Sequence, residues 1–386
     1  MPVYSEEDID SAVAAGALDA TAAAKLREHM SSVRELPRGD EESFRLVTSF
    51  NDIFVTIGVV ILLVAVGSIA GTLASPTSAE TILSGALAVL LASGAVALTA
   101  WFLAEVFTRR RRMALPSIVL LIAFVWSIFI ASAALLAIPL GAIAGVNALN
   151  DRAFEENDVS DTLGVILLVA WMLGAGALTV FAAWRHWRRF MVPITIAAGA
   201  SALVGSVLGA IALTDQVLSD GRGTVSMLPL ILIAGLAVFA FAMRWDMSDR
   251  ERTTRRSDVA FWLHLTAAPM IAHPLFASLG VMDGGGAIGI LGAVGVIAVY
   301  VLFGLVALAI DRRALLVSAL AYVLAALTFL FDRFGAVQLN FAFTALIIGS
   351  ALLTLSAFWA PIRARVVNWL PGNWQARLPV TTPLPA

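Results

Sequence analysis

The chain has 386 residues, of which 60% are hydrophobic and 13% are charged, and its formal net charge is −2. Soluble domains carry about a quarter charged residues, so this composition excludes an ordinary water-soluble protein and indicates a chain that lies largely in lipid. The chain contains no cysteine, which excludes disulfides, thiolate metal sites and cysteine nucleophiles.

The first 50 residues are polar and predict a pair of short helices. Ser5 is a suitable N-cap followed by acidic residues, and Gly16 is suited to end the first helix. Asp19 is suited to cap the second helix, which we expect to pack against the first as a hairpin. Residues 1–50 therefore predict a helical hairpin and a linker ahead of the membrane region.

This tail is acidic, with eleven Asp and Glu residues against five Lys and Arg residues from Met1 to Asp52. It lacks the basic start and short apolar run of a cleaved signal peptide, so the first membrane helix must direct insertion. The acidic charge argues against binding to anionic lipid. Two readings stay open: a solvated leader, or an interaction hairpin that uses residues 1–45 to bind a cytoplasmic protein.

Ten apolar runs follow, each near the length of about 20 residues that a helix needs to cross a bilayer. They predict an all-α, polytopic integral membrane bundle over residues 51–360. The predicted helices are Ile53–Leu73, Thr81–Phe107, Leu115–Ile138, Thr162–Trp184, Phe190–Leu213, Val225–Met243, Val259–Val281, Ala287–Ile310, Ala314–Phe331 and Ala336–Ala360.

Two of these runs leave the number of helices open between nine and eleven. The third run continues past Pro139 to Ala148, either as one long, tilted helix, which we favour, or as a re-entrant segment. The ninth run is shorter than the rest.

Positive charge predicts the orientation, because Lys and Arg concentrate in loops that stay in the cytoplasm. With the N-terminus inside, 22 of the 25 Lys and Arg residues fall on the cytoplasmic side. The opposite loops hold only Arg152, Arg222 and Arg333, with ten acidic residues. Both termini are therefore predicted to be cytoplasmic, and residues 361–386, which interleave Arg with Trp and Leu, to lie along the inner surface.

The pattern EEDIDSAVAAGALDATAAAKLREHM, followed by a linker and FNDIFVTIGVVILLVAVG, resembles a bacterial family of predicted multi-pass membrane proteins. That family is defined by a domain of unknown function, in which a cytoplasmic helical leader precedes about eight to ten transmembrane helices. The resemblance implies a bacterial inner-membrane protein. It carries over no catalytic residue.

Ionisable residues inside lipid are costly and often functional, so the few polar groups within the apolar runs are the candidates for a site. The seventh predicted helix contains His264 and His273 together with Pro269 and Pro274, and Asn340 lies near the start of the tenth. Each proline removes a backbone donor, so we expect a broken helix there, as in some transporters. A kinked helix with satisfied polar groups in an inert bundle is the alternative.

A shared metal or haem site is not expected. His264 and His273 are nine residues apart, about 13.5 Å along an ideal helix and on opposite faces. The remaining histidines, His29 and His186, are expected in cytoplasmic segments. The sequence therefore predicts no metal and no cofactor.

Small residues recur at four-residue spacing in three places and predict close helix packing inside one bundle rather than a dimer face. These are Gly67 and Gly71, Gly141 and Gly145, and Ser201, Gly205 and Gly209.

No motif for an active-site nucleophile, a zinc protease or a nucleotide-binding loop is present. The Gly-rich stretch DGGGAIG at residues 283–289 lacks the Lys-Ser/Thr ending of a phosphate loop. The arginine runs indicate topology and contact with anionic lipid rather than nucleic acid. The sequence therefore favours a non-enzymatic membrane protein with an interaction hairpin; the alternative is a secondary transporter of a small solute with a 5+5 helix arrangement.

Overall fold

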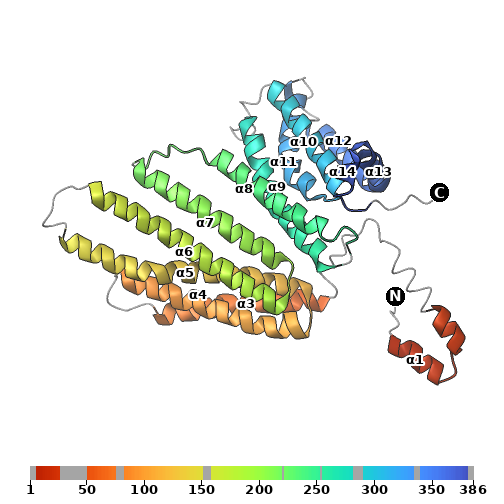
Figure 1. Cartoon of the computed structure of the whole chain (residues 1–386), viewed down its shortest axis with the longest axis horizontal. Helices are drawn as coiled ribbons and strands as arrows, with labels where there is room; N and C mark the ends of the chain where they lie inside the picture. Colours follow the sequence, from red (N-terminus) through yellow and green to blue (C-terminus); the bar gives the residue numbers. More distant parts are fainter. Residues whose placement is uncertain are drawn as a thin grey trace.

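The computed structural model describes residues 6–26, 50–74, 82–150, 158–219, 221–252, 254–280, 290–333 and 340–380, and these residues form helices without any strand (Figure 1). The predicted all-α class is confirmed. The elements are α1 (Glu6–Ala14), α3 (Phe50–Ala74), α4 (Ile82–Ala104), the π-helix η1 (Glu105–Arg110), α5 (Ala114–Asn150), α6 (Asp158–Phe190), α7 (Ile194–Leu218), α8 (Met227–Met247), α9 (Arg255–Ser278), α10 (Ile290–Ile310), α11 (Ala314–Arg333), α12 (Asn340–Ala357), α13 (Trp359–Trp369) and α14 (Gly372–Gln375).

Each predicted apolar run coincides with one of the helices α3 to α12. Eight described helices, α3 to α10, are long and apolar enough to cross a membrane, and the bent pair of α12 and α13 makes a ninth if it is one span. In α11 the described apolar stretch, Leu315–Leu324, is shorter. The chain is therefore a multi-pass membrane protein, with eight or nine candidate spans among the described residues. The prediction of about ten spans stays a prediction, because part of α11 lies outside the described side chains.

The helix α5 settles the question that the sequence left open at Pro139. It runs through this proline as one helix of 37 residues, so the long helix is confirmed and no re-entrant turn is present there. Its length is about 55 Å at 1.5 Å per residue, well beyond the hydrocarbon thickness. Together with α6, of 33 residues, it extends past α7 on the left of Figure 1.

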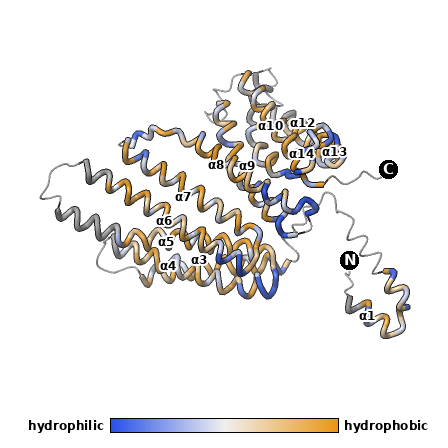
Figure 2. The backbone as a smooth tube through the Cα atoms, viewed as in Figure 1, coloured by the Kyte–Doolittle hydropathy of each residue, from blue (hydrophilic) through white to orange (hydrophobic). Residues whose placement is uncertain are grey.

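Two hydrophobic cores hold the membrane helices together. The first lies among α3, α4, α5 and the turn from α6 to α7, and includes Leu63, Leu120 and Phe190. The second lies among α7 to α13 and includes Leu263 and Phe276. Hydrophobic residues cover most of the helix lengths in Figure 2, and many of the large ones are exposed, as expected of a surface that faces lipid.

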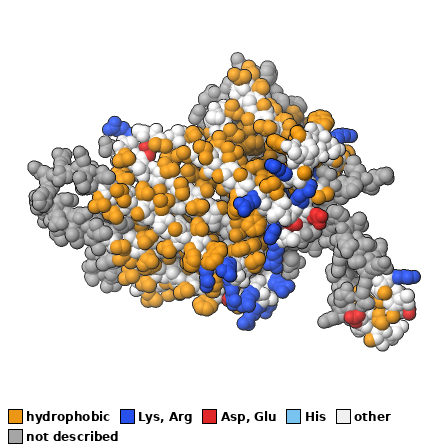
Figure 3. Space-filling model, viewed as in Figure 1, with side chains coloured by type: hydrophobic (Ala, Val, Ile, Leu, Met, Phe, Trp, Pro, Cys, Tyr) orange, Lys and Arg blue, Asp and Glu red, His pale blue; other side chains and the backbone are white. Residues whose placement is uncertain are grey.

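One end of the bundle, which we call the arginine end, is formed by the turns at residues 111–113, 191–193, 248–252 and 311–313. Arginine side chains gather along this edge in Figure 3. Each turn contains one non-glycine residue in the left-handed region: Arg112, Met191, Arg252 and Asp311, with φ between 52° and 57°. This backbone conformation ends a helix within one residue and returns the chain directly into the next helix.

The N-terminal segment has the two capping positions expected from the sequence. Gly16 has φ of 71°, and the N–H of Leu18 donates to the Ala12 carbonyl at 3.1 Å, which ends α1. The Asp19 carboxylate accepts the N–H of Thr21 at 3.0 Å and starts a helix over residues 20–26. Hydrogen bonds from the Thr21 side chain and backbone hold the pKa of Asp19 below its usual value. Ser5 lies outside the described residues.

Glycines bring helices close within the bundle. A Cβ added to Gly67 of α3 would meet Val96 of α4 at 3.1 Å, and one added to Gly209 of α7 would collide with Met172 of α6. Gly205 belongs to the same four-residue pattern as Gly209, but a Cβ added there would meet no other atom within 4 Å. The tightest approach to a backbone is at Gly235 of α8, where a Cβ would lie 2.9 Å from Met270 Cβ and 3.0 Å from the Met270 carbonyl carbon of α9.

We therefore predict that Gly235→Ala lowers the free energy of unfolding by about 1–3 kcal/mol, because a backbone contact cannot give way as a side chain does. Gly205→Ala is the matched control and should be neutral or stabilising, since alanine favours the helix and meets nothing there. The measurement is the thermal midpoint of the purified protein in detergent. Equal midpoints for the two variants would contradict the close α8–α9 packing.

Candidate functional site: a buried ion cluster at the arginine end

Three ionisable side chains from distant parts of the sequence meet inside the bundle. Asp246 is next to the last residue of α8, His264 lies in α9, and Arg312 lies in the turn between α10 and α11. Their exposed fractions are 1%, 0% and 3%, respectively. We call these three residues the buried ion cluster.

The Asp246 carboxylate is the centre of the cluster. Its Oδ2 lies 2.8 Å from His264 Nε2, and its Oδ1 accepts a hydrogen bond from Arg312 Nη2 at 2.6 Å. The same guanidinium donates to the Ser257 carbonyl in the first turn of α9, at 2.9 Å. The cluster thereby ties α8, α9 and the α10–α11 turn to one another.

The local structure explains how these groups reach one another. Asp311 ends α10 in the left-handed conformation, and the N–H of Arg312 donates to the Ala307 carbonyl at 2.9 Å, which turns the chain back toward α8. Ala242 of α8 and Ala260 of α9 are fully buried, so small side chains let the two helices approach. Phe239 meets the His264 ring edge-on, with centroids 5.0 Å apart.

Charge balance favours a neutral imidazole. With Asp246 paired to Arg312, a neutral His264 that donates from Nε2 leaves the buried ion cluster with no net charge, which is the form that costs least in an apolar surrounding. His264 Nδ1 is buried and has no hydrogen-bond partner among the described residues. The histidine therefore acts here as a hydrogen-bond donor to the carboxylate.

A second carboxylate, Asp311, extends the network. Its Oδ2 accepts from Arg252 Nη1 at 2.7 Å, and its Oδ1 accepts from Trp359 Nε1 at 2.7 Å. Arg363 Nε of α13 lies 3.6 Å from Oδ1. Burial lowers the pKa of Arg252, and the nearby Arg312 lowers it further, although a guanidinium stays charged in proteins.

The C-terminal residues are held by Arg363 of this network and by Arg250. Arg250 Nε donates to the Leu378 carbonyl at 2.8 Å, and Arg363 Nη2 donates to the Pro379 carbonyl at 2.7 Å. Arg313 stacks on the Trp359 ring, 4.7 Å from its centroid. The described part of the tail is thus fastened to the bundle as far as Val380, and its position along the membrane surface stays a prediction.

The candidates from the seventh predicted helix separate into two places. His264 belongs to the buried ion cluster, whereas His273 Nδ1 lies 3.0 Å from the Tyr322 hydroxyl of α11. Pro269 and Pro274 lie inside α9, which continues through both as one helix of 24 residues. The broken helix expected there is absent, since α9 loses only single backbone donors while its packing against α8 and α11 persists.

Two further expectations have different outcomes. Asn340 begins α12, but its side chain lies outside the described residues, so its place in a site stays a prediction. His186 was expected in a cytoplasmic segment and lies near the C-terminal end of α6, 1% exposed, against Trp101, Phe124 and Phe190. Its Nδ1 is 3.4 Å from the Thr195 hydroxyl.

Sequence reasoning missed Asp246, Asp311, Arg252 and Arg312 because it counted arginines at this end only as topology signals. One signal was present: acidic residues stand among the arginines at the same helix ends, and such acids need nearby cations when they are buried. The sharp bend also lies elsewhere than expected, between α12 and α13, at 78°.

Within the described ranges, no group of three or more His, Cys, Asp or Glu side chains is placed to hold a metal ion. No protein-family model, no curated protein sequence and no solved structure matches the chain. The role of the buried ion cluster therefore rests on its geometry, and the family resemblance stays a prediction.

We predict that Asp246→Asn lowers the free energy of unfolding by about 3–5 kcal/mol, because it leaves the Arg312 charge buried without a counterion. Glu251→Gln, which removes an exposed acid from the same end, should change it by less than about 0.5 kcal/mol. Thermal unfolding in detergent measures both. A small effect of Asp246→Asn, comparable to that of the control, would show that Arg312 reaches water.

Proposed function

We propose that this multi-pass membrane protein is a non-enzymatic scaffold of the bacterial inner membrane that presents its N-terminal hairpin to a cytoplasmic protein. The proposal rests on the contacts of the ionisable groups in the membrane region, which are with one another. Asp246, His264 and Arg312 bind one another and tie helices together, which leaves no acid, base and nucleophile set facing a substrate among them.

The hairpin supports the second half of the proposal. Its first helix is ended at Gly16, its second is capped by Asp19, and Ala23 is buried. Glu6, Glu7 and Asp8 begin α1, so the hairpin carries negative charge. This negative charge is complementary to a basic surface, so we expect the partner to present one.

The secondary-transporter alternative has less support. It required a broken α9 and a polar cavity at His273. The helix is continuous, His273 binds Tyr322, and neither of the two described cavities is lined by His264 or His273. The described cavities and the contact of His273 with Tyr322 therefore give no support to a 5+5 transporter.

The orientation belongs to the same proposal, with both termini and the arginine end in the cytoplasm. The absence of cysteine in the chain makes single-cysteine labelling direct. Ser226 and Ser248 cap the two ends of α8, and both are exposed. We expect an impermeant maleimide to label Ser226→Cys in intact cells and Ser248→Cys only after permeabilisation; the reverse pattern would invert the topology.

Removal of the hairpin tests the interaction. A variant lacking residues 1–45 should insert, purify and unfold at the wild-type midpoint, but should lose a stoichiometric partner recovered with the full chain after crosslinking. The triple variant Glu6→Gln, Glu7→Gln, Asp8→Asn should weaken that recovery, and Lys25→Gln should not. Recovery of the same partner with the deleted chain would disprove the role of the hairpin.

A further inference from the structure

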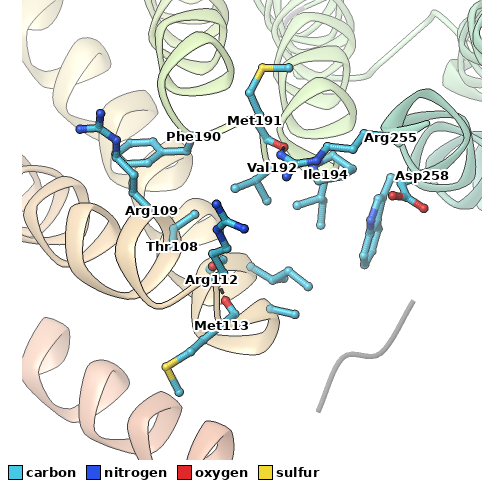
Figure 4. A pocket seen from close by; sticks show the side chains of 15 residues that line it. Thr108, Arg109, Arg112, Met113, Phe190, Met191, Val192, Ile194, Arg255 and Asp258 are labelled. Atoms are coloured by element: carbon cyan, nitrogen blue, oxygen red, sulfur yellow. Dashed lines mark hydrogen bonds between the residues drawn. The ribbon is translucent and has the colours of Figure 1, made fainter. Parts of the chain in front are cut away.

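A basic pocket opens at the arginine end, at the point where the two hydrophobic cores adjoin (Figure 4). Its volume is about 410 Å³. Three segments form its walls: the end of η1 with the start of α5, the turn from α6 to α7, and the start of α9. The pocket therefore bridges the first and second halves of the membrane domain.

Three arginines and one acid line this pocket. Arg255 Nη1 donates to the Met191 carbonyl at 3.3 Å, and Arg109 pairs with Glu105 at 3.2 Å, which leaves both guanidinium groups with further donors. Arg112 has no ion-pair partner among the described residues. In Figure 4, Arg112 and Arg255 extend toward the hollow from opposite walls, while Asp258 lies at its α9 side. The lining carries net positive charge.

The backbone adds to this preference for an anion. The pocket is bordered by the N-termini of α5 at Ala114, of α7 at Ile194 and of α9 at Arg255, where the positive ends of the helix dipoles lie. The first turn of α7 has Pro193 at its N-cap and no side-chain cap. The Thr108 hydroxyl, which also lines the pocket, is buried and has no hydrogen-bond partner in the described part of the chain.

The remaining wall is apolar, with Ile118, Ile194 and Trp262. A soluble anion would use only the basic half of such a pocket. A ligand with a phosphate and hydrocarbon chains would use both halves, and arginines at this depth are suited to headgroup phosphates.

We propose that the pocket binds one anionic glycerophospholipid, with its phosphate between Arg112 and Arg255 and its acyl chains along the apolar wall. The bound lipid connects α5, α7 and α9 and so joins the two cores. The site does not involve the N-terminal hairpin, so the lipid proposal and the proposed scaffold role can be tested independently.

The first test uses the wild-type full chain in detergent, followed by native mass spectrometry and thermal unfolding. We expect one retained phosphatidylglycerol, a raised unfolding midpoint, and binding about tenfold tighter than that of phosphatidylcholine. Equal binding of the two lipids would overturn the proposal. A midpoint raised as much by glycerol 3-phosphate alone would also overturn it, because the ligand would then be a soluble anion.

Matched variants locate the site. Arg112→Gln with Arg255→Gln should weaken phosphatidylglycerol binding by about tenfold or more, whereas Arg111→Gln with Arg256→Gln, the adjacent arginines outside the pocket, should leave it unchanged. Equal losses of phosphatidylglycerol binding in the two double variants would overturn the proposal, because binding would then depend only on the net positive charge of the arginine end.

If the first pair does not fold, Thr108→Val keeps the shape of the wall and removes only the hydroxyl. It should weaken phosphatidylglycerol binding about fivefold. Unchanged binding by this variant would contradict a phosphate seated in the pocket.

Discussion

A carboxylate inside an apolar helix bundle needs hydrogen-bond donors from the protein, because no water is at hand to solvate it. Asp246 has two such donors, the Arg312 guanidinium and the His264 ring, and both come from other helices or turns. The position of α8 relative to α9 and α11 is therefore fixed by charge as well as by packing. Asp311, which is less buried, likewise accepts hydrogen bonds from two groups distant in sequence, Arg252 and Trp359, and so links the α10–α11 turn to α13.

The two halves of the membrane domain are stabilised in different ways at the same end. In the first half, the His186 ring packs among aromatic side chains, and the ion pair of Glu105 with Arg189 is partly exposed, so solvent screens it. In the second half the charges are buried, and loss of a single partner is costly. The basic pocket lies between these halves, where α7 borders both cores.

Sequence patterns predicted the helices well, because the need for about 20 apolar residues leaves a strong signal in each span. They did not predict the bend after Ala357 or the continuity of α9 through Pro269 and Pro274, since tertiary packing decides whether a helix survives the loss of one backbone donor. His264 was identified as a candidate, but its partners were not. Asp246 and Arg312 are 66 residues apart, and no periodicity within one helix relates them.

Asp246 and Arg312 act as one buried pair that positions the second half of the bundle. A double-mutant cycle with Asp246→Asn and Arg312→Gln tests it most directly, through the free energy of unfolding of the four proteins in one detergent. We predict a coupling energy of about 2 kcal/mol or more, with the double variant more stable than the sum of the single losses implies. Losses that add to within about 0.5 kcal/mol would contradict the claim.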